Sequence, residues 1–310
     1  MIVSMILALV AAALFAVASV LQARGTEGLP DTGATGAGFL VTLAKRKTWL
    51  AGITADILGF VVQAWALAVG SLMLVQPLLV STLLFALPLA AMYEHRRLSG
   101  REWFWAALLF ASLVVFMVLG QPTAGIDDPK LVHWIIPLVV IIPLVAACVS
   151  VGSRLGHGTW RSLVLAVAAG VLLGVSAPLT KTGIAAFGDG LVSGFTSWEF
   201  WAMAVTATLG TLWQQSSYQA GDVQTSLPTV TVLKPLVAMA LGLTIYQESL
   251  RIDHLGDATI GVALAVMMVS TVMLGRLSAP AASPSPDSGV RQTSGDQSAR
   301  RGRFDASDAS

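Results

Sequence analysis

The sequence predicts an all-α membrane protein of nine transmembrane helices, arranged as two inverted repeats of four and five helices. Three observations support this prediction. Of the 310 residues, 55% are hydrophobic and only 11% are charged, whereas about a quarter of the residues in soluble domains are charged. Long apolar segments recur along the chain, and part of the pattern returns in the second half. Together with a mean hydropathy of +0.76, these features indicate a chain that folds in lipid.

Apolar segments of about 20 residues are long enough for an α-helix to cross the hydrocarbon core with its backbone hydrogen bonds satisfied. We expect such helices at residues 2–22, 49–69, 71–93, 103–121, 131–152, 162–180, 198–219, 223–246 and 256–276. The second and third segments meet at Gly70, and the seventh and eighth meet at Gly221, so each pair should form a tight antiparallel hairpin.

Residues 1–276 therefore form one predicted transmembrane domain, with repeats at about 2–121 and 131–276. Residues 277–310 are rich in Ser, Pro, Asp and Arg and predict a disordered cytoplasmic tail. Residues 39–47 predict either a solvated loop or a short interfacial helix that ends in Lys45-Arg46-Lys47.

The distribution of basic residues predicts the orientation. No basic residue precedes Arg24, so the first segment lacks the charged start of a signal peptide. With the N-terminus outside, the segments on the cytoplasmic side hold Arg24, Lys45, Arg46, Lys47, Arg96, Arg97, Arg101, Arg154 and Arg161. The opposite side holds Lys130, Lys181 and Arg251. The positive-inside rule then places the protein in the plasma membrane with its N-terminus outside and its C-terminus in the cytoplasm.

Other classes of function lack their sequence signals. A net charge of +1 gives no reason to expect a nucleic-acid partner. The single cysteine, Cys148, excludes a disulfide framework or a cysteine metal cluster, and the four histidines form no pair at ligand spacing. No zinc-protease, serine-hydrolase or phosphate-binding-loop motif occurs, so we expect neither an enzyme nor a cofactor.

The internal repeat is a self-match at a fixed shift of the sequence. Gly and Gln four residues apart, then Gly at a turn and Pro in the next helix, occur in both halves. The matching residues are Gly59, Gln63, Gly70 and Pro77, and then Gly210, Gln214, Gly221 and Pro228. The copies should cross the membrane in opposite directions, as in many secondary transporters. Because proline removes a backbone hydrogen bond, Pro77, Pro88, Pro228 and Pro235 predict irregular third and eighth helices, and the repeat-related glycines predict hinges.

These residues resemble the drug/metabolite transporter (EamA-like) superfamily. The resemblance is carried by Ala66–Gly70, Pro77 and Glu94 ahead of Arg96-Arg97-Leu98, with a second copy from Pro228 to Glu248. It covers nearly all of residues 2–276 and implies two inverted halves that work by alternating access.

Nine helices with an outside N-terminus imply that the first half lacks one helix, between the first two spans. This arrangement resembles the NIPA-like branch, which is linked to magnesium transport. The stretches Trp49–Gly52 and Gly174–Ala185 are similar to that branch. The branch pattern has an acidic residue after the glycine of the second helix, whereas here Phe60 follows Gly59 and Asp56 lies one turn earlier.

Charged residues inside a span are costly and are therefore functional candidates. Lys234 predicts an anchor for an anionic solute group or a proton-linked switch; structurally, it would pair with Asp56 or bond a carbonyl freed by Pro235. Asp56 predicts a cation or proton ligand, a counter-ion for the lysine, or an interior hydrogen-bonding group. It is a metal ligand only if magnesium is the substrate.

Neutral polar residues on the repeat-related helices predict either a lined pathway or interhelical hydrogen bonds. They are Gln63, Gln214, Gln215 and Tyr218. Lys181, at a helix end, is expected to extend its amine toward the membrane surface. Glu94 and Glu248 would either close gates with Arg97 and Arg251 or be solvated charges at helix ends, and the second reading is favoured.

The predicted function is a secondary transporter of the drug/metabolite type, with the substrate unassigned. A NIPA-like magnesium transporter and a non-transporting membrane scaffold are the alternatives. The expected partners are the lipid bilayer and a small-molecule or ion substrate, and a homodimer is compatible with the sequence.

Overall fold

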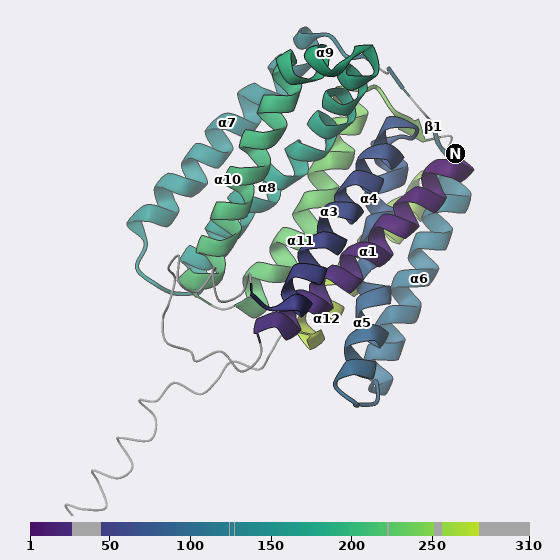
Figure 1. Cartoon of the computed structure of the whole chain (residues 1–310), viewed down its shortest axis with the longest axis vertical. Coiled ribbons are helices and arrows are strands. Elements are labelled where there is room, and N and C mark those ends of the chain that lie inside the picture. The colour runs from purple at the N-terminus through teal and green to yellow at the C-terminus, as the bar shows by residue number, and fades with distance from the viewer. Residues whose placement is uncertain (27–44, 124, 127, 222, 251–255, 279–310) are drawn as a thin grey trace, which may run out of the picture. The chain divides into compact units, whose positions relative to one another are not determined.

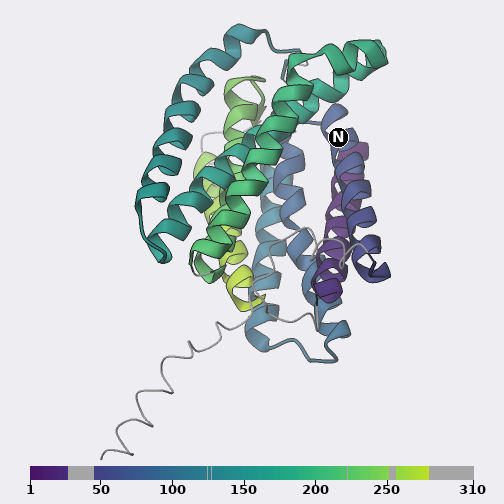
Figure 2. The ribbon, with the colours of Figure 1, turned by 60° about the vertical axis from the view of Figure 1, so that its left-hand side comes forward.

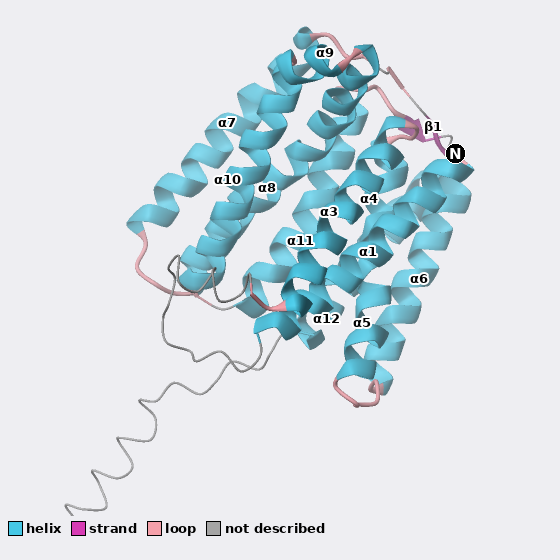
Figure 3. Ribbon diagram, viewed as in Figure 1, coloured by secondary structure: helices cyan, strands magenta, loops and turns pink. Residues whose placement is uncertain are grey.

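The computed structural model describes residues 1–26, 45–123, 125–126, 128–221, 223–250 and 256–278 (Figures 1 and 3). Within these residues the chain is almost entirely helical. The helices are α1 (Ile2–Thr26), α3 (Lys47–Ala68), α4 (Leu72–Val80), α5 (Thr82–Tyr93), α6 (Gly100–Gly120), α7 (Leu131–Arg154), α8 (Thr159–Ala185), η1 (Ala186–Asp189), α9 (Leu191–Thr196), α10 (Trp198–Ala220), α11 (Val223–Thr244) and α12 (Gly256–Ser278). Most of the segment predicted at 39–47 and the tail beyond residue 278 lie outside the described residues.

Each predicted span coincides with helix in this part of the chain. Eight helical segments of the described residues are long and apolar enough to cross a membrane, with α4 and α5 counted as one. The helix α10 has 23 residues but is not among the eight. Its polar residues, including Glu199, Gln214 and Gln215, reduce its hydropathy. The number of long apolar helices therefore indicates a multi-pass membrane protein. That α10 is a ninth span stays a prediction.

The third predicted helix is interrupted, as its prolines predicted. Pro77 lies in α4 and Pro88 in α5, and the two helices are separated at Ser81. Side chains satisfy carbonyls at this break: the Ser81 hydroxyl donates to the carbonyl of Leu78, and the Thr82 hydroxyl donates to that of Leu79 at 2.7 Å. The eighth predicted helix differs. The α11 helix continues through Pro228 and Pro235 without interruption, so neither proline ends it, and an irregular eighth helix stays a prediction.

Successive long helices alternate in direction (Figures 1 and 2). One end of residues 1–278, which we call the strand end, carries η1 and a two-stranded antiparallel sheet of β1 (Pro122–Thr123) and β2 (Ser249–Leu250). The opposite end, which we call the basic end, holds the connections from α5 to α6 and from α7 to α8. Arg96, Arg97 and Arg154 lie at this basic end.

Two helix pairs pack closely in matching ways. A Cβ atom at Gly59 in α3 would lie 3.0 Å from the Phe15 ring of α1, and one at Gly210 in α10 would lie 2.8 Å from Leu173 of α8. Close approach of this kind is typical of small residues between membrane helices. These glycines are packing positions inside continuous helices rather than breaks.

The same pairs share a hydrogen bond near the interhelix turns. The Ser4 hydroxyl donates to the carbonyl of Ala66 at 2.9 Å, and the Ser162 hydroxyl donates to that of Ser217 at 2.8 Å. Each carbonyl lies four residues before a turn glycine, Gly70 or Gly221. A Cβ at Gly70 would overlap the Ser4 hydroxyl, and one at Gly221 would lie 2.6 Å from the carbonyl oxygen of Gly158.

Candidate functional site

A buried ion pair lies at the strand end. The Lys181 ammonium, on the last turns of α8, donates to Glu248 Oε1 at 3.1 Å, and the two side chains are 6% and 0% exposed. The Glu248 carboxylate also accepts from the backbone N–H groups of Leu72, at 2.8 Å, and Met73, at 2.9 Å. These are free donors of the first turn of α4, where the helix dipole favours an anion. The pair thus joins α8, α4 and the segment after α11.

Local backbone positions Glu248 for these contacts. Its N–H donates to the carbonyl of Gly242 at 3.0 Å, and the preceding Gln247 has a left-handed φ of 52°. A Cβ at Gly242 would lie 2.7 Å from Glu248 Oε2, so glycine leaves space for the carboxylate. The backbone conformation at Gln247 therefore positions the Glu248 carboxylate, in addition to the ion pair with Lys181.

Tyr246 completes this cluster. Its hydroxyl donates to the carbonyl of Pro178 at 2.6 Å, and the Lys181 ammonium lies 4.7 Å from its ring centroid. Such cation–π contact adds to the stabilisation of a partly desolvated ammonium. Burial raises the pKa of the Tyr246 hydroxyl, which keeps it a neutral donor.

Two expectations are therefore wrong at this end. Lys181 does not extend into the membrane surface, and Glu248 is not a solvated helix-end charge, because each is the other's partner in the interior. Glu94, its counterpart in the repeat, is exposed and pairs with Arg96 rather than Arg97. Arg251 lies outside the described residues. The sequence showed these charges but not which of them the fold buries.

A second pair of charges lies nearer the middle of the helices. Asp56 is on α3 and Lys234 on α11, and no ion pair within 4.0 Å joins their side chains. Lys234 is half-buried, and Val230 and Ala238, one turn before and after it, are 4% and 0% exposed. Lys234 therefore lies on the inward face of α11, although its amine has no hydrogen-bond partner among the described residues. The expected bond to a carbonyl freed by Pro235 is not formed.

Close packing of α8 brings the Lys234 backbone into the interior. A Cβ at Gly174 would lie 2.9 Å from the Lys234 carbonyl oxygen, and one at Gly170 would lie 2.7 Å from Leu233. Asp56 itself is exposed, while Ala55 and Gly59 beside it are buried. Asp56 therefore lies at the edge of the packed face of α3.

The neutral polar residues divide into two groups. Gln63 is seven residues after Asp56, hence on the same face of α3, and is 4% exposed. Gln214 and Tyr218 are half-buried and bond each other, with the amide donating to the phenol oxygen at 2.7 Å. Gln215 is exposed. The structure thus joins Gln214 with Tyr218 but provides no hydrogen bond from them to Gln63.

Gln76 is a buried polar residue that did not stand out in the sequence. Gln76, next to Pro77 in α4, is 1% exposed, and its Nε2 has no hydrogen-bond partner among the described residues. Buried amides normally have a partner, so an unsatisfied one calls for an explanation. Its place directly before an intramembrane proline was the available signal.

These features define the class: an all-α, multi-pass membrane protein with charged groups placed inside its helix bundle. No family model matches the sequence, and no solved structure matches it. The chain is 33% identical over 286 residues to an uncharacterized protein of Corynebacterium glutamicum, and the alignment covers 89% of this chain and 95% of the relative. The chain therefore belongs to the same family as that Corynebacterium protein, whose description states no activity.

Proposed function

We propose that the protein is a secondary transporter of the drug/metabolite type that moves a small solute across the plasma membrane by alternating access. The observation that carries the proposal is the placement of Asp56 and Lys234. Two opposite charges lie inside helices that are long and apolar enough to cross a membrane, and they do not form an ion pair with each other. A charge inside a membrane span is costly without a partner. Asp56 and Lys234 lack such a partner among the described residues, which favours a role in binding the charged groups of a solute.

The matching helix contacts support an inverted repeat. The spacing from Ser4 to Phe15 in α1 equals that from Ser162 to Leu173 in α8, and both helices contact repeat-related positions of α3 and α10. The helices α1 and α8 run in opposite directions (Figure 1). We therefore pair α1 with α8, which leaves α7 as the helix without a counterpart. This pairing replaces the expectation that a helix is lacking between the first two spans.

The ion pair at the strand end supports a defined conformation. Lys181, Glu248 and the first turn of α4 tie together elements from both halves at that end. If the strand end is outside, as the basic residues at the other end favour, these contacts close the protein on the outside. Transport then requires this pair to separate in the other conformation.

The geometry favours an organic anion or zwitterion over magnesium. Among the described residues, no group of three His, Cys, Asp or Glu side chains could hold a metal ion. Lys234 near Asp56 would repel a divalent cation, whereas a solute with a carboxylate and an amine would match both charges. The NIPA-like alternative would therefore rest on Asp56 alone.

Purified protein in proteoliposomes tests transport directly. Currents are recorded on solid-supported membranes after concentration jumps of amino acids, dicarboxylates and phosphate esters, and a trapped fluorescent indicator reports magnesium entry in parallel. We expect a protein-dependent signal from at least one organic class and none from magnesium. Magnesium entry without any organic signal would support the NIPA-like alternative, and a folded protein that gives no signal would support a scaffold.

A further inference from the structure

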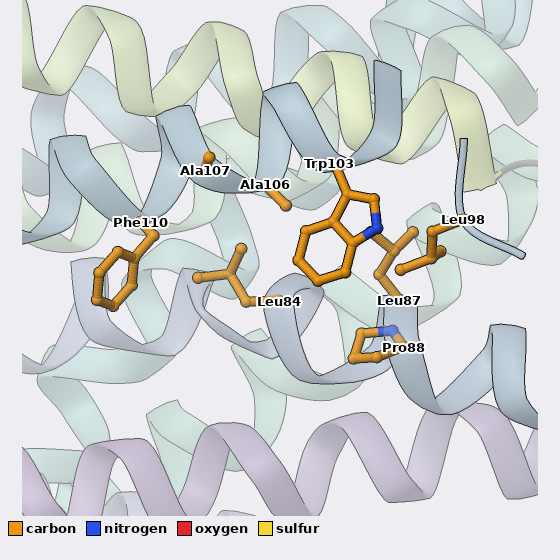
Figure 4. A pocket seen from close by; sticks show the side chains of 8 residues that line it. All are labelled: Leu84, Leu87, Pro88, Leu98, Trp103, Ala106, Ala107 and Phe110. Atoms are coloured by element: carbon orange, nitrogen blue, oxygen red, sulfur yellow. The ribbon is translucent and has the colours of Figure 1, made fainter. Parts of the chain in front are cut away.

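An apolar groove lies between α5 and α6. It has a volume of about 280 Å³, and its lining includes Leu84, Leu87, Ala107 and Phe110 (Figure 4). Phe110 is 61% exposed, and Trp103, which also lines the groove, is 62% exposed. Both helices belong to membrane-spanning segments, so the groove opens toward the acyl chains of the bilayer.

A second pocket continues this groove toward the basic end. Its volume is about 410 Å³, it shares Pro88, Leu98 and Trp103 with the groove, and it adds Arg96 and Arg97. The two arginines lie between the spans Leu72–Tyr93 and Gly100–Gly120. That position corresponds to the headgroup layer, where tryptophan is also enriched.

The two arginines differ in charge compensation. Arg96 is neutralised by Glu94 and by Glu102, the latter at 2.9 Å. Among the described residues, no carboxylate lies within 4.0 Å of Arg97, which is exposed. The pocket therefore offers one uncompensated guanidinium at the end of an apolar groove. Guanidinium groups bind phosphate oxygens well because their donors match the phosphate geometry.

We propose that the α5–α6 hairpin binds one anionic phospholipid, with an acyl chain in the apolar groove and its phosphate headgroup at Arg97. The continuity of the two pockets favours a ligand that is apolar at one end and anionic at the other. A soluble phosphate ester would leave the groove unfilled. The lining of the two pockets includes neither Asp56 nor Lys234, the two charges proposed to bind the transported solute.

Native mass spectrometry of the delipidated full chain tests the site. Phosphatidylglycerol and phosphatidylcholine with identical acyl chains are titrated against wild type, Arg97→Gln and Arg101→Gln. Wild type should prefer phosphatidylglycerol by about five-fold, the contribution of one arginine near an anionic surface. Arg97→Gln should remove the preference. Arg101→Gln is the matched control, because this exposed arginine lines neither pocket.

A second variant tests the groove. Ala107→Trp places a large side chain in it, so binding of both lipids should fall while the thermal midpoint stays near that of wild type. An unchanged preference for phosphatidylglycerol in Arg97→Gln would overturn the proposal. Displacement of the bound lipid by soluble glycerol 3-phosphate would also overturn it, since the site would then select a free phosphate ester.

Discussion

Replacement of Lys181 by methionine is expected to destabilise the protein more than the loss of any charge at its surface. The substitution leaves the Glu248 carboxylate, with a fully buried side chain, without its cation. Removing one partner of a buried ion pair costs about 3–5 kcal/mol because the remaining charge is uncompensated. For a protein of this size we expect a fall in thermal midpoint on the order of 10 °C. The intrinsic fluorescence of its nine tryptophans reports the midpoint.

The double variant Lys181→Met/Glu248→Gln distinguishes an ion pair from simple packing. Glutamine retains an acceptor for one of the two N–H groups of Leu72 and Met73 and carries no charge. It should therefore recover part of the lost stability. Lys130→Met is the matched control, because this exposed lysine lies outside the spans. A midpoint for Lys181→Met equal to that of Lys130→Met would mean that the pair does not stabilise the strand end.

Replacement of Lys234 by methionine is expected to give the largest loss of transport. A hydrogen bond to a charged group contributes about 1.5–3 kcal/mol. Loss of that anchor should therefore lower the apparent affinity for an anionic solute by about 10- to 100-fold. Asp56→Asn should cause a comparable loss if the solute also carries a cation. The measurement is the concentration dependence of the solid-supported-membrane current for the solute with the largest signal.

The combined variant Asp56→Asn/Lys234→Met adds a test of coupling. If both charges hold one solute, the double variant should lose little more than the worse single variant. The control is again Lys130→Met, which should transport as wild type does. Full transport by Lys234→Met with an unchanged apparent affinity would remove Lys234 from the pathway.

The sequence predicted the helices well because each span carries its own signal. About 20 apolar residues bounded by charges or glycine define a membrane helix without reference to the rest of the chain. The break near Ser81 was also predictable from Pro77 and Pro88. In α11, by contrast, the helix accommodates Pro228 and Pro235 without interruption. Neighbouring helices decide whether a proline interrupts a membrane helix.

Side-chain partners were less predictable, since they depend on how distant helices pack. Lys181 and Glu248 are far apart in the sequence, and each resembles an ordinary charge at a helix end. Only the position of the α4 N-terminus makes Glu248 a buried cap. By contrast, Asp56 and Lys234 stood out because charges are rare at the middle of a span. The sequence thus located the candidates for the pathway but not the pair that joins the helices at one end.

If Asp56 belongs to the transport pathway, its side chain faces water rather than lipid, and thiol accessibility tests this most directly. Asp56→Cys and Ile57→Cys are compared in a Cys148→Ser background, with a charged, membrane-impermeant methanethiosulfonate added from either side. Both positions are exposed in the isolated chain, with Ile57 59% exposed, so only the surrounding medium distinguishes them. The reagent reacts with the thiolate form of cysteine. The thiolate forms readily in water but not in hydrocarbon, so only a water-exposed position is labelled. We predict rapid labelling at position 56 from the side of the basic end and none at position 57. Equal resistance of the two positions to the reagent would contradict the account and place Asp56 against lipid.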